Sequence, residues 1–480
     1  MHKYLRILLV IFSMLGSGGY AETLELNLEQ AIGLALKNNV SMQNVQEDLT
    51  KAKAQRKEAF SSALPVISAY GQVSHSFSIA SQPMSFPVPF GIIDAAGNPV
   101  PLTDASGNPV PFTDPNGNVI PGMNLQMTGV QLVPVNLAFG TDNSMVYGFN
   151  LTQPLFEGRV IAAIRGANVY GDLANSVAQV TRLSVIENTK KAFYQTLLAD
   201  RMTVVMEQSL QVMKQNLDNV SALYAQGKTA EFDVIRADVQ VANQTTRVSN
   251  ARKMRALALA AFKRNCGLSI QQDIKTLGQL EVEIKSDLVL ADLEQRLLSN
   301  QPLLDQLNSN VQLMKENILM VKAEFMPSVA LTGSFQQMLP FNDGSYEEAE
   351  FRESSSLALG INLPLFNGFG STARVQKARA DHRKAEYQQQ DVRENLLLEL
   401  KNIYLSIVES SRKIEAGRKG VKQAHKGVDM AQRLFQQGMA SQLQVLDAQS
   451  ASDQAELGLY QAYFEYNSAR ASLTRALGEE

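Results

Sequence analysis

An internal duplication constrains this 480-residue chain more than any other feature of its sequence. The recurring segments are Leu151–Gly158 with Ile361–Gly368, Leu223–Gly227 with Leu434–Gly438, and the helix-ending stretch before Pro65 with that before Pro327. The offset is 210 for the first pair (368 − 158), 211 for the second (438 − 227) and 262 for the third (327 − 65). Because a repeated sequence indicates a repeated structural unit, we expect two similar repeats, residues 22–280 and 281–480.

The first repeat contains an insertion that the second lacks. Residues 83–122 are rich in Pro, Gly and Asn, and the motif Asp-x-x-Gly-Asn begins at Asp94, Asp104 and Asp114. Such residues favour turns and interrupt helices and central strands, so we expect a surface loop over residues 83–143. The motif lacks the dense carboxylates of calcium-binding loops.

Four segments alternate between apolar and polar residues, as strands with two unlike faces do. They are residues 66–79, 144–153, 329–337 and 355–363. A soluble sandwich would alternate in the same way, but the polar face carries Ser, Gly, Asn and Thr rather than charges, which favours a lipid-facing barrel wall. Since about eight strands are needed to close a barrel, several chains would share one.

Two very long helical patterns are expected over residues 159–226 and 369–437, each followed by a shorter one, over 231–265 and 441–477. Apolar residues keep a 3-4-3-4 spacing at Leu210, Met213, Leu217, Val220 and Tyr224, and again at Val421, Ala424, Val428, Ala431 and Phe435. A period of 3.5 residues indicates coiled-coil packing. For either copy taken by itself, an isolated antiparallel hairpin is the alternative explanation of this spacing.

The N-terminus reads as a cleavable signal peptide, residues 1–21. Lys3 and Arg6 precede an apolar run over residues 7–15, which is shorter than the roughly 20 residues of a membrane-spanning helix. No later apolar stretch is long enough for such a helix either, so any membrane crossing would use strands. Cys266 is the single cysteine, which excludes an internal disulfide, and we expect it to be a small buried residue near a helix end.

Composition argues against several functions. Lys+Arg number 44 and Asp+Glu 47, so there is no basic excess for nucleic-acid binding. His2, His75, His382 and His425 are not at metal-ligand spacing, and nucleophile motifs and phosphate-binding loops are missing. We therefore expect no metal, no cofactor and no enzymatic activity.

The chain resembles the TolC-like outer membrane efflux protein family over essentially the whole mature sequence. The resemblance is carried by the opening segment Leu26–Asn39, the two Pro-Leu-Phe-x-Gly junctions, and the tips around Gly227 and Gly438. It implies an α+β membrane protein: a homotrimer with a twelve-stranded β-barrel in the outer membrane, four strands per chain, which continues into a long periplasmic α-helical coiled-coil barrel. The insertion would then be extracellular.

The implied function is that of an exit duct in a tripartite efflux or type I secretion system, which passes small molecules or proteins without catalysis. The implied partners are a periplasmic adaptor (membrane fusion protein), an inner-membrane pump and outer membrane lipid. A periplasmic coiled-coil adaptor or scaffold is the alternative, although it would not need four lipid-suited strands. The sequence does not predict the cargo.

The resemblance also implies roles for individual residues. The adaptor would dock on the hairpin tips, at Gln226, Gly227, Lys228, Gln437, Gly438 and Met439. The periplasmic gate would use Tyr224, Asp233, Phe435 and Asp447. Barrel and helices would meet at Pro65, Pro154, Gly158, Pro327, Pro364 and Gly368.

The gate departs from the family pattern at three positions. Gln444 stands where an acidic residue is expected, Ala440 replaces a latching arginine, and Phe435 lacks a tyrosine hydroxyl. An acidic constriction from Asp447 is therefore expected. These residues are compatible both with a strong polar latch and with a weak one.

Overall fold

The computed structural model describes residues 24–89, 106, 115–116, 118, 130–138, 140–284, 288–342 and 349–480. The predicted signal peptide and most of the Asp-x-x-Gly-Asn motifs lie outside these residues. The chain forms two compact units. The helical unit contains Glu157–Pro327, Leu363–Glu480 and the described residues up to Ser62, and the strand unit contains Ala63–Phe156 and Ser328–Asn362.

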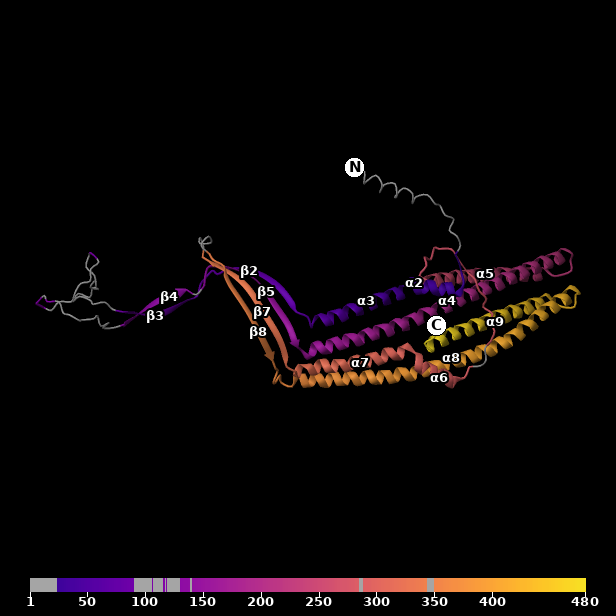
Figure 1. Ribbon diagram of the computed structural model, residues 1–480. Helices are drawn as coiled ribbons and strands as arrows, with labels where there is room; N and C mark the ends of the chain where they lie inside the picture. Colours follow the sequence, from indigo (N-terminus) through magenta and orange to yellow (C-terminus); the bar gives the residue numbers. More distant parts are fainter. Residues whose placement is uncertain are drawn as a thin grey trace, which may run out of the picture. The chain divides into compact units, whose positions relative to one another are not determined.

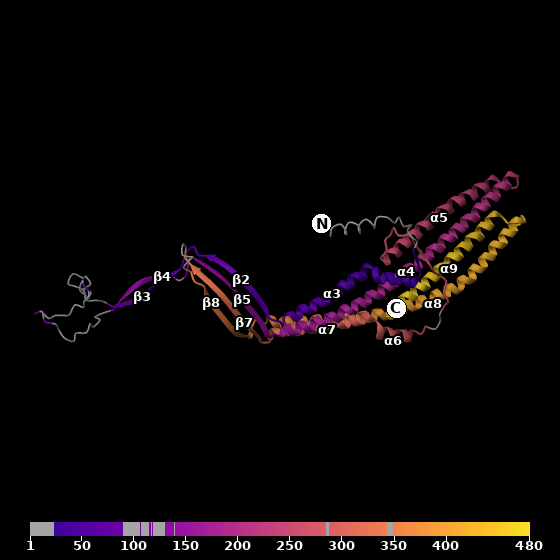
Figure 2. The same cartoon turned by 45° about the horizontal axis from the view of Figure 1, so that its top comes forward.

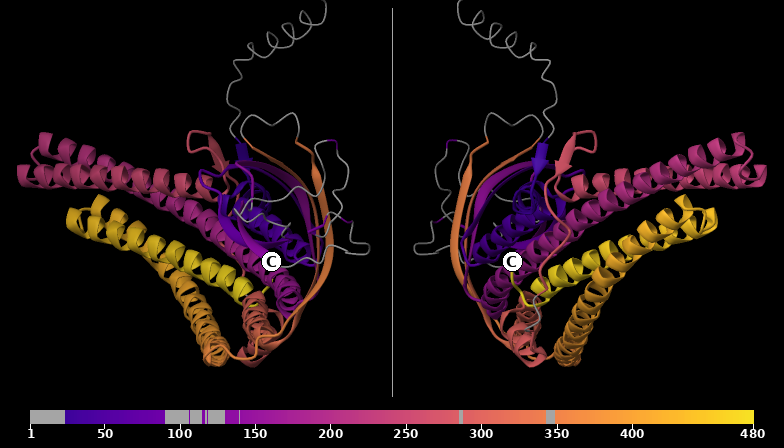
Figure 3. Two further views of the ribbon diagram at one scale, coloured as in Figure 1. Left: turned by 90° about the vertical axis from the view of Figure 1, so that its left-hand side faces the viewer. Right: turned by 90° about the vertical axis from the view of Figure 1, so that its right-hand side faces the viewer.

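Two long hairpins dominate the helical unit (Figure 1). The first pairs α4 (Gly158–Ala225) with α5 (Glu231–Asn265), and the second pairs α8 (Gly370–Gln436) with α9 (Gln442–Ala476). All four predicted helices are confirmed, and α4 runs unbroken for 68 residues. Figures 2 and 3 show both hairpins extending as paired rods.

Shorter elements complete the helical unit. They are α2 (Leu28–Asn38), α3 (Val40–Ser61), α6 (Leu290–Asn300), α7 (Pro302–Lys322), the 3-10 helix η1 (Ala323–Phe325), and the parallel pair β1 (Leu24–Leu26) and β6 (Ile274–Thr276). None of the helices in the described part of the chain combines the length and the apolar character that a bilayer crossing requires.

The duplication is visible in matching hydrogen bonds. Asn39, between α2 and α3, donates from Nδ2 to the main-chain oxygen of Asn265 at 2.8 Å. Gln301, between α6 and α7, donates from Nε2 to the main-chain oxygen of Ala476 at 2.8 Å. These residues are related by the sequence offsets of 262 (301 − 39) and 211 (476 − 265). The same side-chain amide contact therefore holds the C-terminal end of the second hairpin helix in both repeats, α5 in the first and α9 in the second.

The main apolar core lies where the short helices meet the hairpins. Phe262, Leu297, Leu400 and Ile414 are fully buried there. Cys266 caps the end of α5 in this core, as the sequence predicted. Burial raises the pKa of its thiol to about 12, so the side chain stays neutral.

The strand unit contains an antiparallel sheet of four strands in the order β2-β5-β7-β8. Their bounds are β2 (Val66–His75), β5 (Asn143–Phe156), β7 (Ser328–Phe341) and β8 (Arg352–Asn362). All four predicted segments form strands, although β2 ends at His75 rather than at residue 79.

The register of this sheet separates an apolar face from a polar one. Ile67 pairs with Leu151, which pairs with Gly333, and Gly333 pairs with Leu357. The next row is Ser68, Asn150, Ser334 and Ser356, in which the two last hydroxyls lie 2.8 Å apart. The alternation seen in the sequence therefore continues across the whole sheet.

The insertion differs from the surface loop that its composition predicts. Its ends pair as a two-stranded antiparallel ladder, β3 (Ser81–Pro89) with β4 (Val130–Ala138). Pro83, Pro87 and Pro89 occupy alternate register positions of β3, and Pro134 pairs at an intervening position of the same set. Alternate residues of a strand direct their N–H groups away from the partner. Proline is therefore tolerated in this ladder, which the loop prediction did not allow for.

Candidate functional site at the hairpin tips

The first hairpin tip ends α4 with a Schellman motif. The Lys228 N–H donates to the Leu223 carbonyl at 2.9 Å, and the Gly227 N–H donates to the Tyr224 carbonyl at 2.8 Å. Gly227 has a φ of 72°, a left-handed conformation that this motif requires and that glycine adopts without strain.

The second tip repeats the same geometry. Met439 donates to the Leu434 carbonyl and Gly438 to the Phe435 carbonyl, both at 2.9 Å, and the φ of Gly438 is also 72°. The predicted docking residues Gln226, Gly227, Lys228, Gln437, Gly438 and Met439 are all exposed on these two turns.

The two tips begin their second helices differently. Ser441 and Gln444 form a capping box at the start of α9, in which the Ser441 N–H donates to Gln444 Oε1 at 2.8 Å. At the start of α5, the N-cap is Ala230, and the Thr229 hydroxyl donates to Asp233 Oδ2 at 2.7 Å. Asp233 thus stabilises its own helix N-terminus, and Gln444 takes part in the capping box of α9.

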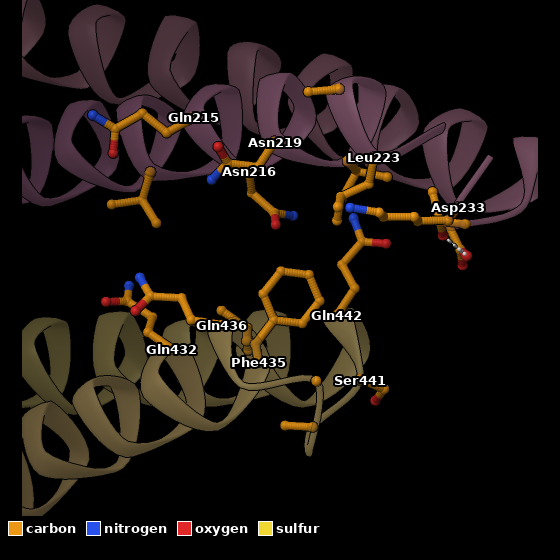
Figure 4. A pocket seen from close by; sticks show the side chains of 18 residues that line it. Gln215, Asn216, Asn219, Leu223, Asp233, Gln432, Phe435, Gln436, Ser441 and Gln442 are labelled. Carbon is orange, nitrogen blue, oxygen red and sulfur yellow. Dashed lines mark hydrogen bonds between the residues drawn. The ribbon is translucent and has the colours of Figure 1, made fainter. Parts of the chain in front are cut away.

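A cavity of about 900 Å³ lies between the two tips (Figure 4). Its walls come from the ends of α4 and α8 and the starts of α5 and α9. It contains four of the predicted site residues, Lys228, Asp233, Phe435 and Gly438. Of the other two predicted gate residues, Tyr224 is 45% exposed and Asp447 is exposed on α9, and neither lines the cavity.

Sequence reasoning did not identify Gln442, which lines the same cavity. Gln442 is only 8% exposed, and within the described residues neither amide atom has a hydrogen-bond partner. Figure 4 shows its side chain reaching toward Leu223 on the first hairpin. No sequence signal marks it, because its burial depends on a helix more than 200 residues away in the chain.

Further along the hairpins, a polar contact joins α4 to α9. The buried Ser209 hydroxyl donates to Asp453 Oδ2 at 2.5 Å, and Gln449 Nε2 donates to Asp453 Oδ1 at 2.8 Å. Burial raises the pKa of the Asp453 carboxyl, because these two hydrogen bonds offset the desolvation only in part. No motif in the sequence singles out Ser209 or Asp453.

The raised pKa of Asp453 predicts a pH-dependent effect of the substitution Asp453→Asn. A buried carboxylate with a raised pKa destabilises the fold at neutral pH, and this cost disappears as the pH falls through the folded-state pKa. We therefore expect Asp453→Asn to raise the melting temperature at neutral pH and to change it little at acidic pH. Thermal unfolding followed by circular dichroism over a pH series would measure the difference. A variant that is less stable than the wild type at neutral pH would contradict the expectation.

The predicted junction residues lie at element boundaries within their own units. Pro65 precedes β2, and Pro154 lies in β5 beside a register shift. Pro327 follows η1, Pro364 follows β8, and Gly368 has a φ of 65° just before α8.

Gly158, the first residue of α4, packs tightly within the helical unit. A Cβ atom there would lie 2.8 Å from Met326 Sδ and 2.9 Å from the Ala323 side chain. The close approach accounts for a glycine at this predicted junction position.

Glu324 in η1 connects the starts of the two long helices. Its carboxylate accepts from Arg159 of α4 at 3.1 Å, from Arg374 of α8 at 2.6 Å and from Ser371 at 2.7 Å. The hydrogen bond from Arg374, followed by that from Ser371, holds the pKa of Glu324 below its usual value. The sequence analysis did not single out this cluster.

Comparison with known proteins places this geometry in context. The model of the outer membrane efflux protein family matches residues 31–268 and 293–479. The alkaline protease secretion protein AprF of Pseudomonas aeruginosa is 21% identical over 333 residues, 69% of each chain. The outer membrane protein TolC of Escherichia coli is 21% identical over 356 residues, 70% of each chain.

The fold is also similar to that of solved proteins. The CmeC outer membrane channel of Campylobacter jejuni superposes with a TM-score of 0.73 at 16% sequence identity, over 94% of this chain and 85% of CmeC. At this identity, the likeness supports the shared fold.

Proposed function

The chain belongs to the outer membrane efflux protein family, and from this premise we propose that three copies form one duct whose periplasmic end is closed by the hairpin tips. The chain is an exit duct of an efflux or type I secretion system. It lies in the outer membrane with its helical part in the periplasm.

The open edges of the four-stranded sheet support the trimer. Within the described residues, β2 pairs only with β5, and β8 pairs only with β7. An unpaired edge is unfavourable in lipid, where water cannot satisfy the main chain. Joining β8 of one copy to β2 of the next would remove all such edges in a twelve-stranded barrel.

The apolar face of the same sheet supports contact with lipid. Ile67, Val73, Leu357, Leu359 and Ile361 share this face and are 60% to 72% exposed. A face of this kind is costly in water but suited to a bilayer. It favours the duct over the alternative of a periplasmic scaffold.

Single-channel recording tests the duct directly. We expect the purified protein to insert into planar bilayers with a small conductance that rises when the tips are loosened, for example by Phe435→Ala. This substitution is expected to loosen the tips because Phe435 lines the cavity between the two hairpins. Insertion without conductance, for the wild type and for the loosened variant alike, would overturn the duct.

For the gate, we propose that the exposed Asp447 of each copy faces the lumen and gives the constriction its negative charge. Replacing Asp447 with alanine is then expected to weaken cation selectivity and divalent block, because a carboxylate ring concentrates cations electrostatically. Reversal potentials in a salt gradient measure this, with the exposed Asp218 of α4 as the control position. Equal selectivity in the wild type and in Asp447→Ala would remove Asp447 from the gate.

For the partners, we propose that a periplasmic adaptor docks on the exposed tip residues and connects the duct to an inner-membrane pump. The matching turns at Gly227 and Gly438 support this, since they present two similar surfaces per chain. Crosslinking in cells at Lys228, followed by mass spectrometry, would identify the adaptor. A tip that yields no crosslink to a periplasmic protein would contradict docking there.

A further inference from the structure

Gln442 has no role in the gate proposed above, yet its surroundings are unusual for a glutamine. It is the first residue of α9, it is 8% exposed, and both Nε2 and Oε1 lack a hydrogen-bond partner within the described residues. Buried amides without partners are costly and rare in native proteins. A ligand that supplies both an acceptor and a donor would satisfy this side chain.

The cavity that Gln442 enters is lined by uncharged polar side chains and apolar side chains in similar measure (Figure 4). Its amide side chains are Gln215, Asn216, Asn219, Gln432, Gln436 and Gln442. The charged side chains on its wall, Lys228 and Asp233, have opposite signs, and Asp233 accepts a hydrogen bond from Thr229 at 2.7 Å. A neutral polar ligand is therefore favoured over an ion.

Apolar side chains form the rest of the wall. Val220 is 2% exposed and Val445 is 6% exposed, and Leu223 and Phe435 line the same cavity. The volume of about 900 Å³ lies near the upper end of the range of ligand pockets and is large enough for a short peptide turn. Amides on the wall match the N–H and C=O groups of such a turn, and the apolar residues match a small aliphatic side chain.

We propose that this cavity is a hydrogen-bonding socket for the main chain of the protein that docks on the tips, with Gln442 as its specificity-determining residue. The inference rests on the adaptor docking proposed above. The ligand is an uncharged turn with exposed main-chain N–H and C=O groups. Since its recognition uses neutral groups, binding depends little on salt.

Affinity measurements with two matched leucine variants test the socket. The probe is the host's periplasmic adaptor, identified from the Lys228 crosslink and then purified, and the receptor is the full-length duct in detergent. Gln442→Leu keeps the volume but removes donor and acceptor, so we expect about tenfold weaker binding, typical of one lost buried hydrogen-bonded site. The control is Gln454→Leu on the exposed side of α9, which should bind like the wild type.

Two further readouts separate a socket from a structural role. The melting temperature of Gln442→Leu should be equal to or above that of the wild type, because an unpaired buried amide is removed. Hydrogen exchange should show protection at one turn of the bound adaptor, and this protection should be lost with Gln442→Leu.

The outcomes distinguish the inference from the function on which it rests. Wild-type affinity in Gln442→Leu overturns the socket but leaves adaptor docking intact. A wild-type duct that does not bind the purified adaptor overturns the docking itself. Native mass spectrometry that detects a small solute, lost in Gln442→Leu and present without adaptor, overturns the peptide ligand in favour of a solute site.

Discussion

Replacing Gly478 with alanine is expected to lower the thermal stability of the helical unit more than the same replacement at Gly438. Gly478 follows α9 with a φ of 73°, and a Cβ atom there would overlap the main-chain oxygen of Asn300. A left-handed alanine costs roughly 1–2 kcal/mol. The overlap adds about 1–3 kcal/mol, since α6 must move away. Thermal unfolding of the detergent-solubilised protein would measure the combined loss.

The chain supplies a matched control for this substitution. Gly438 has nearly the same φ, 72°, and ends α8 with the same motif, but among the described residues no atom lies within 4 Å of its Cβ position. Gly438→Ala should therefore show the backbone strain alone. Gly267, the repeat equivalent of Gly478, meets the main chain of Asn38 and should behave like Gly478. Equal losses at Gly438 and Gly478 would show that the contact with Asn300 contributes nothing.

Replacing Arg475 with methionine is the second substitution with a large expected effect. Arg475 Nε lies 2.6 Å from Glu187 Oε2, and its Nη2 pairs with Glu399, which joins α9 to α4 and α8. Glu187 is only 8% exposed, so loss of the arginine leaves a buried carboxylate without its main partner. Breaking such a pair typically costs about 3–5 kcal/mol. Because Lys191 and Ser472 still contact Glu187, we expect the lower end of that range.

The loss of stability caused by Arg475→Met is expected to be larger at neutral pH than in acid. Burial disfavours the Glu187 carboxylate, but hydrogen bonds from Lys191 and Ser472 and the charge of Arg475 outweigh burial and lower the pKa of Glu187. A lowered carboxyl pKa stabilises the fold above the unfolded-state pKa, and this stabilisation is lost as pH falls through the folded-state value. The difference between wild type and Arg475→Met should therefore shrink in acid.

An exposed ion pair provides the comparison. Lys419 and Glu415 pair on α8 with side chains 78% and 70% exposed, so Lys419→Met should change stability by less than about 1 kcal/mol. If Arg475→Met lowered stability as little as Lys419→Met, burial of Glu187 would not make its ion pair with Arg475 more important than an exposed pair. The double variant Glu187→Gln, Arg475→Met should recover part of the stability, since it removes the unpaired charge.

Local patterns were sufficient to predict the four helices of the two long hairpins and the four strands of the sheet. The 3.5-residue period predicts α4 and α8, and their ends follow from Gly227 and Gly438, because a left-handed residue terminates a helix by itself. The two-residue period predicts β2, β5, β7 and β8. The composition of the insertion did not predict β3 and β4, because prolines are tolerated at alternate positions of a ladder, and the register is set by the partner strand.

Residue roles were predicted less completely. Asp233 was selected as a gate residue, and the structure places it against Thr229 at its own helix start. Glu324, Asp453 and Arg475 were not selected, because each is defined by partners from other helices. A charged residue in an amphipathic pattern looks the same whether it meets solvent or an ion pair.

By itself, the sequence determined the duplication, the long helices, the four strands of the sheet and the family, because these depend on spacing along the chain. Only the tertiary structure decided which polar groups are buried and whether they are paired. Gln442 shows the reason most clearly. Its position is fixed by the start of α9, but its burial and its unpaired amide depend on α4, more than 200 residues earlier in the chain.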